Sequence, residues 1–214
     1  MKSIRSKLLM AIAAVTVSTA IVVGSLVYSI SREALEETSF DKLIAVRELK
    51  ADQVDSFFRT IRDQVIALSA NGMLIDAMES FSGAFDDALA PDPTLDAAVL
   101  RTFYAEEFMT RARAAQAPVD NVTDLWPADP RSQRMQHLYL AANPFPVGEK
   151  YQLDRSSNTS RYADVHANYH PFLRDFSKRF GFYDLFLVDA ENGYIVYSVE
   201  KEIDFATSLL DGPF

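Results

Sequence analysis

The sequence predicts an α+β fold with an N-terminal membrane anchor, and three observations lead to this prediction. Residues 8–30 form an uncharged apolar run. The segment that follows, up to residue 69, has neither Pro nor Gly, and its apolar residues recur at helical spacing. Two strand-like runs joined by a short Asn-Gly turn lie near the C-terminus. The expected elements are a transmembrane helix, a long helix, a layer of shorter helices and the first hairpin of a sheet.

The apolar run from Leu8 to Ile30 holds 23 consecutive residues without a charge. A helix rises about 1.5 Å per residue, so the run is long enough to cross a hydrocarbon core of roughly 30 Å. The alternative is a cleaved signal peptide, which has an apolar region of only about 7–15 residues and a small-x-small cleavage site. The bulky Leu26, Val27 and Tyr28 at the end of the run do not fit such a site. We therefore predict an uncleaved anchor in contact with membrane lipid.

Positive charges mark the cytoplasmic end of this anchor. Lys2, Arg5 and Lys7 precede it without any acidic residue. Lys and Arg resist translocation, so residues 1–7 are expected in the cytoplasm and everything after Ile30 outside it. The chain is thus predicted to cross the membrane once.

Composition narrows the range of functions. The net charge is −9, and since the first seven residues carry +3, the part beyond the anchor carries −12. An acidic external domain argues against binding of nucleic acid or of anionic lipid headgroups. The chain has no cysteine, which excludes disulfides, thiol catalysis and cysteine-ligated zinc. A cysteine-free external domain fits the bacterial envelope, so the inner (cytoplasmic) membrane is the expected location, with the bulk of the chain periplasmic or extracellular.

Residues 31–70 are predicted to form one long helix that continues out of the membrane. Apolar residues recur along it at helical spacing: Leu35, Leu43, Val46, Val54, Phe57, Phe58, Ile61, Val65 and Leu68. A helix of this length is rarely stable alone in water, so its apolar stripe must meet the chain's own domain or a second copy of the chain. A homodimer is the expected assembly, and Asn71-Gly72 is expected to end the helix.

A layer of helices is predicted within the external domain, residues 71–214. The first helix runs from Met73 to about Ala90 and is ended by Pro91-Asp-Pro93. Thr94 is predicted to cap the next helix. Further helical segments are expected at residues 94–117, 133–142 and 161–180, the last kinked or restarted at Pro171.

A β-hairpin is predicted near the C-terminus. Two runs rich in aromatic and branched apolar residues, Tyr183–Val188 and Tyr194–Val199, flank the turn Asp189–Gly193. A lone two-stranded hairpin is only marginally stable. We therefore expect a missing C-terminal part to complete the sheet, which would make this chain an N-terminal fragment.

Two blocks of residues carry a resemblance to a known family. The first lies on the long helix, at residues 40–50, 53–58 and 62–65 (FDKLIAVRELK, QVDSFF and RDQV). The second lies around the hairpin, at residues 183–189, 193–198, 201–205 and 207–209 (YDLFLVD, GYIVYS, KEIDF and TSL). Residues 138–144 (LYLAANP) and 169–171 (YHP) also match. The sequence resembles the extracytoplasmic, double-Cache-like sensor region of bacterial transmembrane signalling proteins such as chemoreceptors and membrane adenylate/guanylate cyclases.

This resemblance implies a Cache/PAS-like sheet and an input module that binds an external small-molecule cue. In such proteins a second transmembrane helix, a relay and a cytoplasmic output domain follow, and the expected output is a cyclase or a chemotaxis signalling domain. The input module itself is expected to be neither an enzyme nor a cofactor-binding protein. Its expected partners are an unknown small molecule and a second copy of the chain, with no nucleic acid.

The candidate ligand-binding residues are aromatic, charged or imidazole side chains in and around the predicted hairpin and helical layer: Trp126, Arg161, Tyr169, His170, Tyr183, Asp184, Tyr197 and Asp204. Aromatic walls with a few placed charges are typical of pockets for small polar ligands. The alternative is that any one of these aromatic residues simply packs the sheet on the helices. No catalytic residue is assigned, because the carboxylates around the hairpin fit turn and capping roles.

Two histidines suggest a different class of function. His166 and His170 are four residues apart and can share a helical face, as paired metal ligands do, with Asp164 as a third ligand. However, Ala167 stands where a zinc protease motif has Glu, and Pro171 disturbs the next turn. Hydrogen bonding by these histidines is therefore preferred, and no metal is assigned. The alternatives to a sensor are a membrane-anchored envelope metallohydrolase and a helical assembly scaffold.

Overall fold

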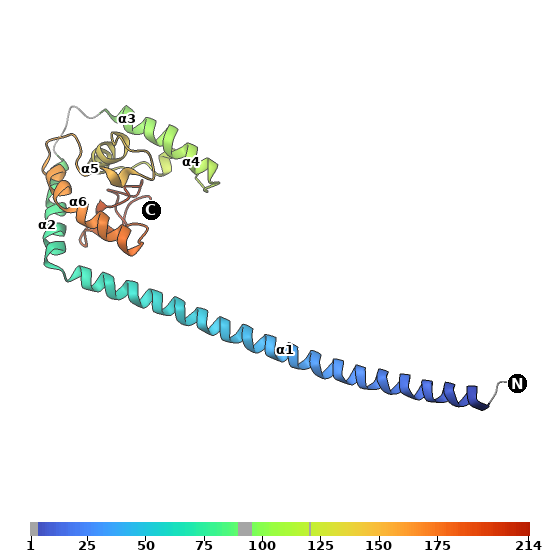
Figure 1. Ribbon diagram of the computed structural model, residues 1–214. Coiled ribbons are helices and arrows are strands. Elements are labelled where there is room, and N and C mark those ends of the chain that lie inside the picture. The colour runs from blue at the N-terminus through green and yellow to red at the C-terminus, as the bar shows by residue number, and fades with distance from the viewer. Residues whose placement is uncertain (1–3, 90–95, 120) are drawn as a thin grey trace. The chain divides into compact units, whose positions relative to one another are not determined.

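The computed structural model describes residues 4–89, 96–119 and 121–214, and the chain divides into two compact units (Figure 1). The described part of the first unit, up to Ala67, is a single helix, and the second unit runs from Leu68 to Phe214. The chain is mostly helical with one two-stranded antiparallel sheet in the described residues. The α+β prediction is confirmed at this coarse level.

Helix α1 (Ile4–Ser69) is continuous over 66 residues and contains the apolar run near its N-terminus. By length and composition it is able to cross a membrane there. Hydroxyl groups within the run donate to carbonyl groups of the preceding turn, as Thr16 does to Ile12 at 3.1 Å and Ser18 to Ala14 at 2.8 Å. These bonds satisfy polar side chains that hydrocarbon would otherwise leave unpaired. The prediction of one continuous helix from the apolar run to residue 69 is confirmed.

The second unit contains short helices followed by a hairpin. Its α-helices are α2 (Gly72–Asp86), α3 (Ala97–Thr102), α4 (Met109–Ala114), α5 (Pro130–Gln136) and α6 (Arg161–Phe180). The π-helical turns η2 (Phe103–Phe108) and η4 (His137–Ala141) continue α3 and α5, and 3₁₀ turns lie at η1 (Asp87–Leu89), η3 (Val122–Asp124) and η5 (Lys150–Gln152). The strands are β1 (Phe186–Val188) and β2 (Ile195–Ser198).

Polar caps explain where the helices begin. The side chains of Asn71 and Asp96 each accept a hydrogen bond from the amide two residues on, at 2.9 Å and 2.8 Å. Asn71 therefore separates α1 from α2, as predicted. The helix predicted up to Ala117 begins after Asp96 and consists of α3, η2 and α4. The expected cap Thr94 and the break at Pro91–Pro93 lie outside the described residues.

Helix α6 runs unbroken through Pro171, so the predicted restart there was wrong. Proline has no amide hydrogen, and the bond to the Ala167 carbonyl is lost. The helix continues because tertiary packing holds one face of it, where the side chains are fully buried: His166, His170, Leu173 and Ser177. The end of α6 is set by Gly181, whose φ of 72° is left-handed.

The two strands form the predicted hairpin. Leu187 pairs with Tyr197, and the register shifts by a bulge just after Leu187. In the turn, the amide of Gly193 donates to the carbonyl of Asp189 at 2.8 Å, and Gly193 has a left-handed φ of 73°. Glycine takes this conformation without steric cost.

Aromatic side chains join the hairpin to the helices. The ring of Phe81 on α2 lies 5.4 Å from that of Tyr162 on α6 and 4.7 Å from that of Tyr197 on β2. Such pairs contribute about 0.5–1.5 kcal/mol each beyond their buried area. Helices α2 and α6, which also pack on each other, therefore supply cover that a lone hairpin needs.

Candidate functional site

The second unit holds a buried polar cluster, which consists of His166 and His170 on α6, Tyr197 on β2 and Lys201 just after β2. None of the four side chains is more than 3% exposed. His170 lies at its centre: its Nδ1 accepts from the Tyr197 hydroxyl at 2.7 Å, and its Nε2 donates to the Tyr151 carbonyl at 2.6 Å. Burial and the nearby Lys201 lower the pKa of His170 to about 2, so the imidazole is neutral.

Lys201 is the residue of the cluster that sequence reasoning missed. Its backbone is left-handed, with a φ of 57°. Its Nζ donates to the Val199 carbonyl at 3.2 Å and lies 3.4 Å from His170 Nδ1. Within the described ranges no carboxylate forms an ion pair with it. Burial lowers its pKa to about 7, partly opposed by the charge of Asp184.

The second imidazole, that of His166, stacks on His170 with ring centroids 4.3 Å apart. Its Nδ1 donates to the Asp154 carbonyl at 2.7 Å, while its buried Nε2 meets no hydrogen-bond partner in the described part of the chain. Burial holds its pKa well below the usual value. Both nitrogens of His170 are already bonded, so the pair does not offer two free ligands to a metal. No group of three metal-binding side chains occurs among the residues described.

Asp184 fixes the backbone around this cluster. One carboxylate oxygen accepts from the amides of Val199 at 2.9 Å and Glu200 at 3.1 Å, and the other accepts from the Ser198 hydroxyl at 2.8 Å. These bonds join the start of the hairpin to its end. The carboxylate of Asp184 is thus occupied by structural contacts.

The Asp204 carboxylate, unlike that of Asp184, is not fully satisfied by hydrogen bonds within the described residues. Its Oδ1 is buried and has no hydrogen-bond partner in the part of the chain that is described. Burial, together with the charges of Asp184 and Glu202, raises its pKa to about 6. Its carboxyl group therefore titrates just below neutral pH.

The other predicted ligand-binding residues lie apart from the cluster. Tyr183 is 76% exposed and donates to Glu202 at 2.7 Å. The ring of Tyr169 is 6.0 Å from that of Phe81, in the core. Trp126 is half-buried, with the Arg101 guanidinium 4.6 Å from its ring. The structure thus brings His170 into contact with Tyr197 and sets Asp184 close by, but it does not gather all the candidates around one cavity.

Arg161, the remaining candidate, lines a small cavity of about 210 Å³ between α2, α5 and α6. Its guanidinium pairs with Asp87 at 3.1 Å. Two further polar residues, Arg134 and Ser160, line the cavity. The rest of the lining is largely apolar: Ala84, Ala88, Met135, Leu138 and Tyr162. Sequence reasoning missed Arg134 because its nearness to Arg161 depends on how α5 packs against α6.

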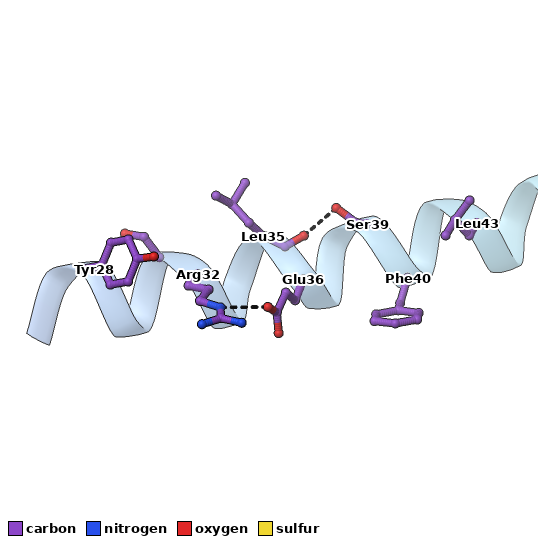
Figure 2. A pocket seen from close by; sticks show the side chains of 8 residues that line it. Tyr28, Arg32, Leu35, Glu36, Ser39, Phe40 and Leu43 are labelled. Atoms are coloured by element: carbon purple, nitrogen blue, oxygen red, sulfur yellow. Dashed lines mark hydrogen bonds and ion pairs between the residues drawn. The ribbon is translucent and has the colours of Figure 1, made fainter. Parts of the chain in front are cut away.

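A second hollow lies on α1, just beyond the apolar run (Figure 2). It is lined by residues of one helix only, among them Tyr28, Leu35 and Phe40. Among the lining residues, Arg32 donates a hydrogen bond to Glu36 at 2.9 Å (Figure 2). A gap between side chains of a single helix cannot enclose a ligand, so this surface is better suited to packing against another helix.

Comparison with models of protein families found no matching family, and comparison with curated proteins and with solved structures found no similar chain.

Proposed function

We propose that this chain is the extracytoplasmic input module of a bacterial transmembrane receptor. It binds an external small-molecule cue and relays it through α1 to a cytoplasmic output domain of the cyclase or chemotaxis kind. The observation that carries this proposal is the continuity of α1, because one unbroken helix leads from the apolar run to the start of the folded unit. An unbroken helix has no loop along its length, so a displacement of one end is transmitted to the other end.

The cavity beside Arg161 is the proposed binding site. Helix α2 contributes Ala84 to it and the following turn η1 contributes Ala88, and only Ala70 and Asn71 separate α2 from α1. A ligand that prefers one arrangement of α2 against α6 shifts the population of that arrangement by its differential affinity. A coupling of about 1–3 kcal/mol is enough for a useful response.

The charges around the cavity favour a small anionic ligand. Guanidinium groups bind carboxylates through two parallel hydrogen bonds, and the cavity has two of them, on Arg134 and Arg161. The Asp87 carboxylate pairs with the Arg161 guanidinium, and a ligand carboxylate would replace it there. The volume of about 210 Å³ lies below the roughly 300–1,000 Å³ of pockets for drug-sized ligands. A small organic acid is therefore the proposed cue.

Thermal unfolding of the full chain in lipid nanodiscs, against a panel of carboxylates, amino acids and amines, tests this function. A ligand at about 100 times its dissociation constant adds roughly 2.7 kcal/mol to the free energy of unfolding. We expect a selective shift with a carboxylate that is lost in Arg161→Ala. Arg155→Ala is the matched control, because Arg155 pairs with Asp164 on the surface and does not line the cavity. A well-folded sample without any selective shift would contradict ligand sensing and favour a scaffold.

A further inference from the structure

The part of α1 beyond the membrane carries a regular seam of apolar residues. The seam starts at Phe40 and advances by alternating steps of four and three residues to Val65. Its eight positions are apolar except for Arg47. This spacing averages 3.5 residues, which is the repeat of a left-handed coiled coil.

The seam is uncovered in the single chain. Six of its apolar positions are exposed: Phe40, Ile44, Ala51, Val54, Phe58 and Val65. Phe40 and Phe58 are 66% and 63% exposed. Burial of apolar surface contributes about 25 cal/mol per Å², so a row of aromatic and branched side chains favours association with a matching surface.

We propose that residues 40–65 of α1 form a parallel two-stranded coiled coil with a second copy of this chain. The parallel orientation rests on the membrane anchor in the function proposed above. Two copies inserted with the same topology start their helices at the same membrane face, so the seams run side by side in register. Each seam position then packs between four residues of the facing helix.

The charges that flank the seam favour the parallel arrangement. Lys50 precedes Ala51 on one flank, and Asp55 follows Val54 on the other. In a parallel pair these flanks face each other across the interface, so Lys50 of each helix meets Asp55 of the other. In an antiparallel pair each flank faces its own copy, so Lys50 loses its acidic partner and the mainly acidic flank of Asp41, Glu48, Asp55 and Arg62 is set against itself.

Arg47 interrupts the apolar seam at a single level. Its guanidinium lies 3.6 Å from the Glu48 carboxylate on the acidic flank, and both side chains are largely exposed. A polar residue at one seam position weakens a coiled coil but fixes its register, because any shift buries the charge against an apolar layer. Arg47 is therefore the residue that holds the two helices in register.

Disulfide scanning tests the coiled coil directly, because the chain contains no cysteine. Ala51→Cys and Val65→Cys place a thiol on the seam, and Ser56→Cys places one on the opposite face. Each full-length variant is oxidised in native membranes and resolved by non-reducing electrophoresis. Seam positions bring two Cβ atoms within disulfide reach, so we expect both seam variants to cross-link on the order of tenfold faster than Ser56→Cys.

The outcomes separate this inference from the proposed function. Cross-linking at only one of Ala51→Cys and Val65→Cys would overturn the parallel register and with it the shared topology of the anchors. Equal rates at Ser56→Cys, or no cross-linking at either seam position, would overturn the coiled coil. Neither result bears on ligand sensing, which the unfolding shift and its loss in Arg161→Ala report separately.

Discussion

At the scale of single residues, Lys201 has the most unusual surroundings in the polar cluster. Lys201 is 3% exposed; its Nζ donates to the carbonyls of Ser198 and Val199 and lies 3.4 Å from Nδ1 of the neutral His170. Removing a charge from water is costly without a paired opposite charge, so the fold favours the neutral amine. The cluster therefore links protonation to folding.

This environment predicts how stability depends on pH. The pKa of Lys201 falls from 10.5 in the unfolded chain to about 7 in the fold. As the pH falls, the Lys201 amine therefore takes up its proton in the unfolded chain before it does so in the folded chain. The free energy of unfolding is thus highest above the unfolded-state pKa and decreases as the pH approaches the folded-state pKa. We expect urea unfolding between roughly pH 9 and pH 7.5 to show a loss that approaches about 1.4 kcal/mol per pH unit.

The variant Lys201→Met isolates this effect, because its side chain cannot be protonated. The free energy of unfolding of this variant is expected to change less with pH than that of the wild type. The difference between the two slopes is about 1 kcal/mol per pH unit. Lys150, whose pKa burial also lowers, contributes equally to both proteins. Lys178→Met is the matched control, since Lys178 is exposed and pairs with Glu200. An unchanged slope in Lys201→Met would show that the amine is solvated.

At the scale of elements, glycines set the ends of α6 and of the hairpin turn. Gly181 and Gly193 have nearly the same left-handed φ, 72° and 73°. Their surroundings differ: an added Cβ meets nothing within 4 Å at Gly181 but approaches Leu210 Cγ to 2.7 Å at Gly193. The first glycine is required by conformation alone, and the second by conformation and packing together.

This contrast predicts unequal costs for the same substitution. Gly181→Ala is expected to lower the free energy of unfolding by about 1 kcal/mol, which is the left-handed strain of a non-glycine residue. Gly193→Ala adds overpacking against Leu210, so we expect a further loss of roughly 1–3 kcal/mol. Chemical denaturation of the two variants measures the difference. Equal losses would mean that the segment around Leu210 moves aside freely.

At the scale of the whole molecule, one helix serves as proposed membrane anchor, as proposed dimer interface and as connection to the folded unit. The anchor depends on the absence of charge between Leu8 and Ile30. The proposed coiled coil depends on a seam that begins ten residues later, at Phe40. A charge placed in one segment should therefore leave the other intact.

The proposed anchor is tested by Val22→Arg, which places a charge near the centre of the apolar run. An Arg at the middle of a membrane helix costs about 2.5–3.5 kcal/mol of insertion free energy. We expect this variant to be partly extracted from membranes by alkaline carbonate, whereas the wild type stays in the pellet. Leu49→Arg, on α1 but outside both the run and the seam, is the control. Complete extraction of the wild type would contradict a membrane-spanning α1.

The sequence by itself determined the elements whose signals are local. The apolar run, the unbroken periodicity of α1, the break at Asn71-Gly72 and the turn ending at Gly193 each depend on residues close together in the chain, so their structures were predicted. Periodicity and turn chemistry act within a few residues, and tertiary packing rarely overrides them when they agree.

Only the tertiary structure decided which polar side chains share a site. The contact of His170 with Lys201 joins residues 31 apart, and the cavity between Arg134 and Arg161 joins different helices. The same holds for the continuity of α6 through Pro171, which the buried face of the helix maintains against the local preference. Burial and pairing arise from packing between distant segments, and no local pattern specifies that packing.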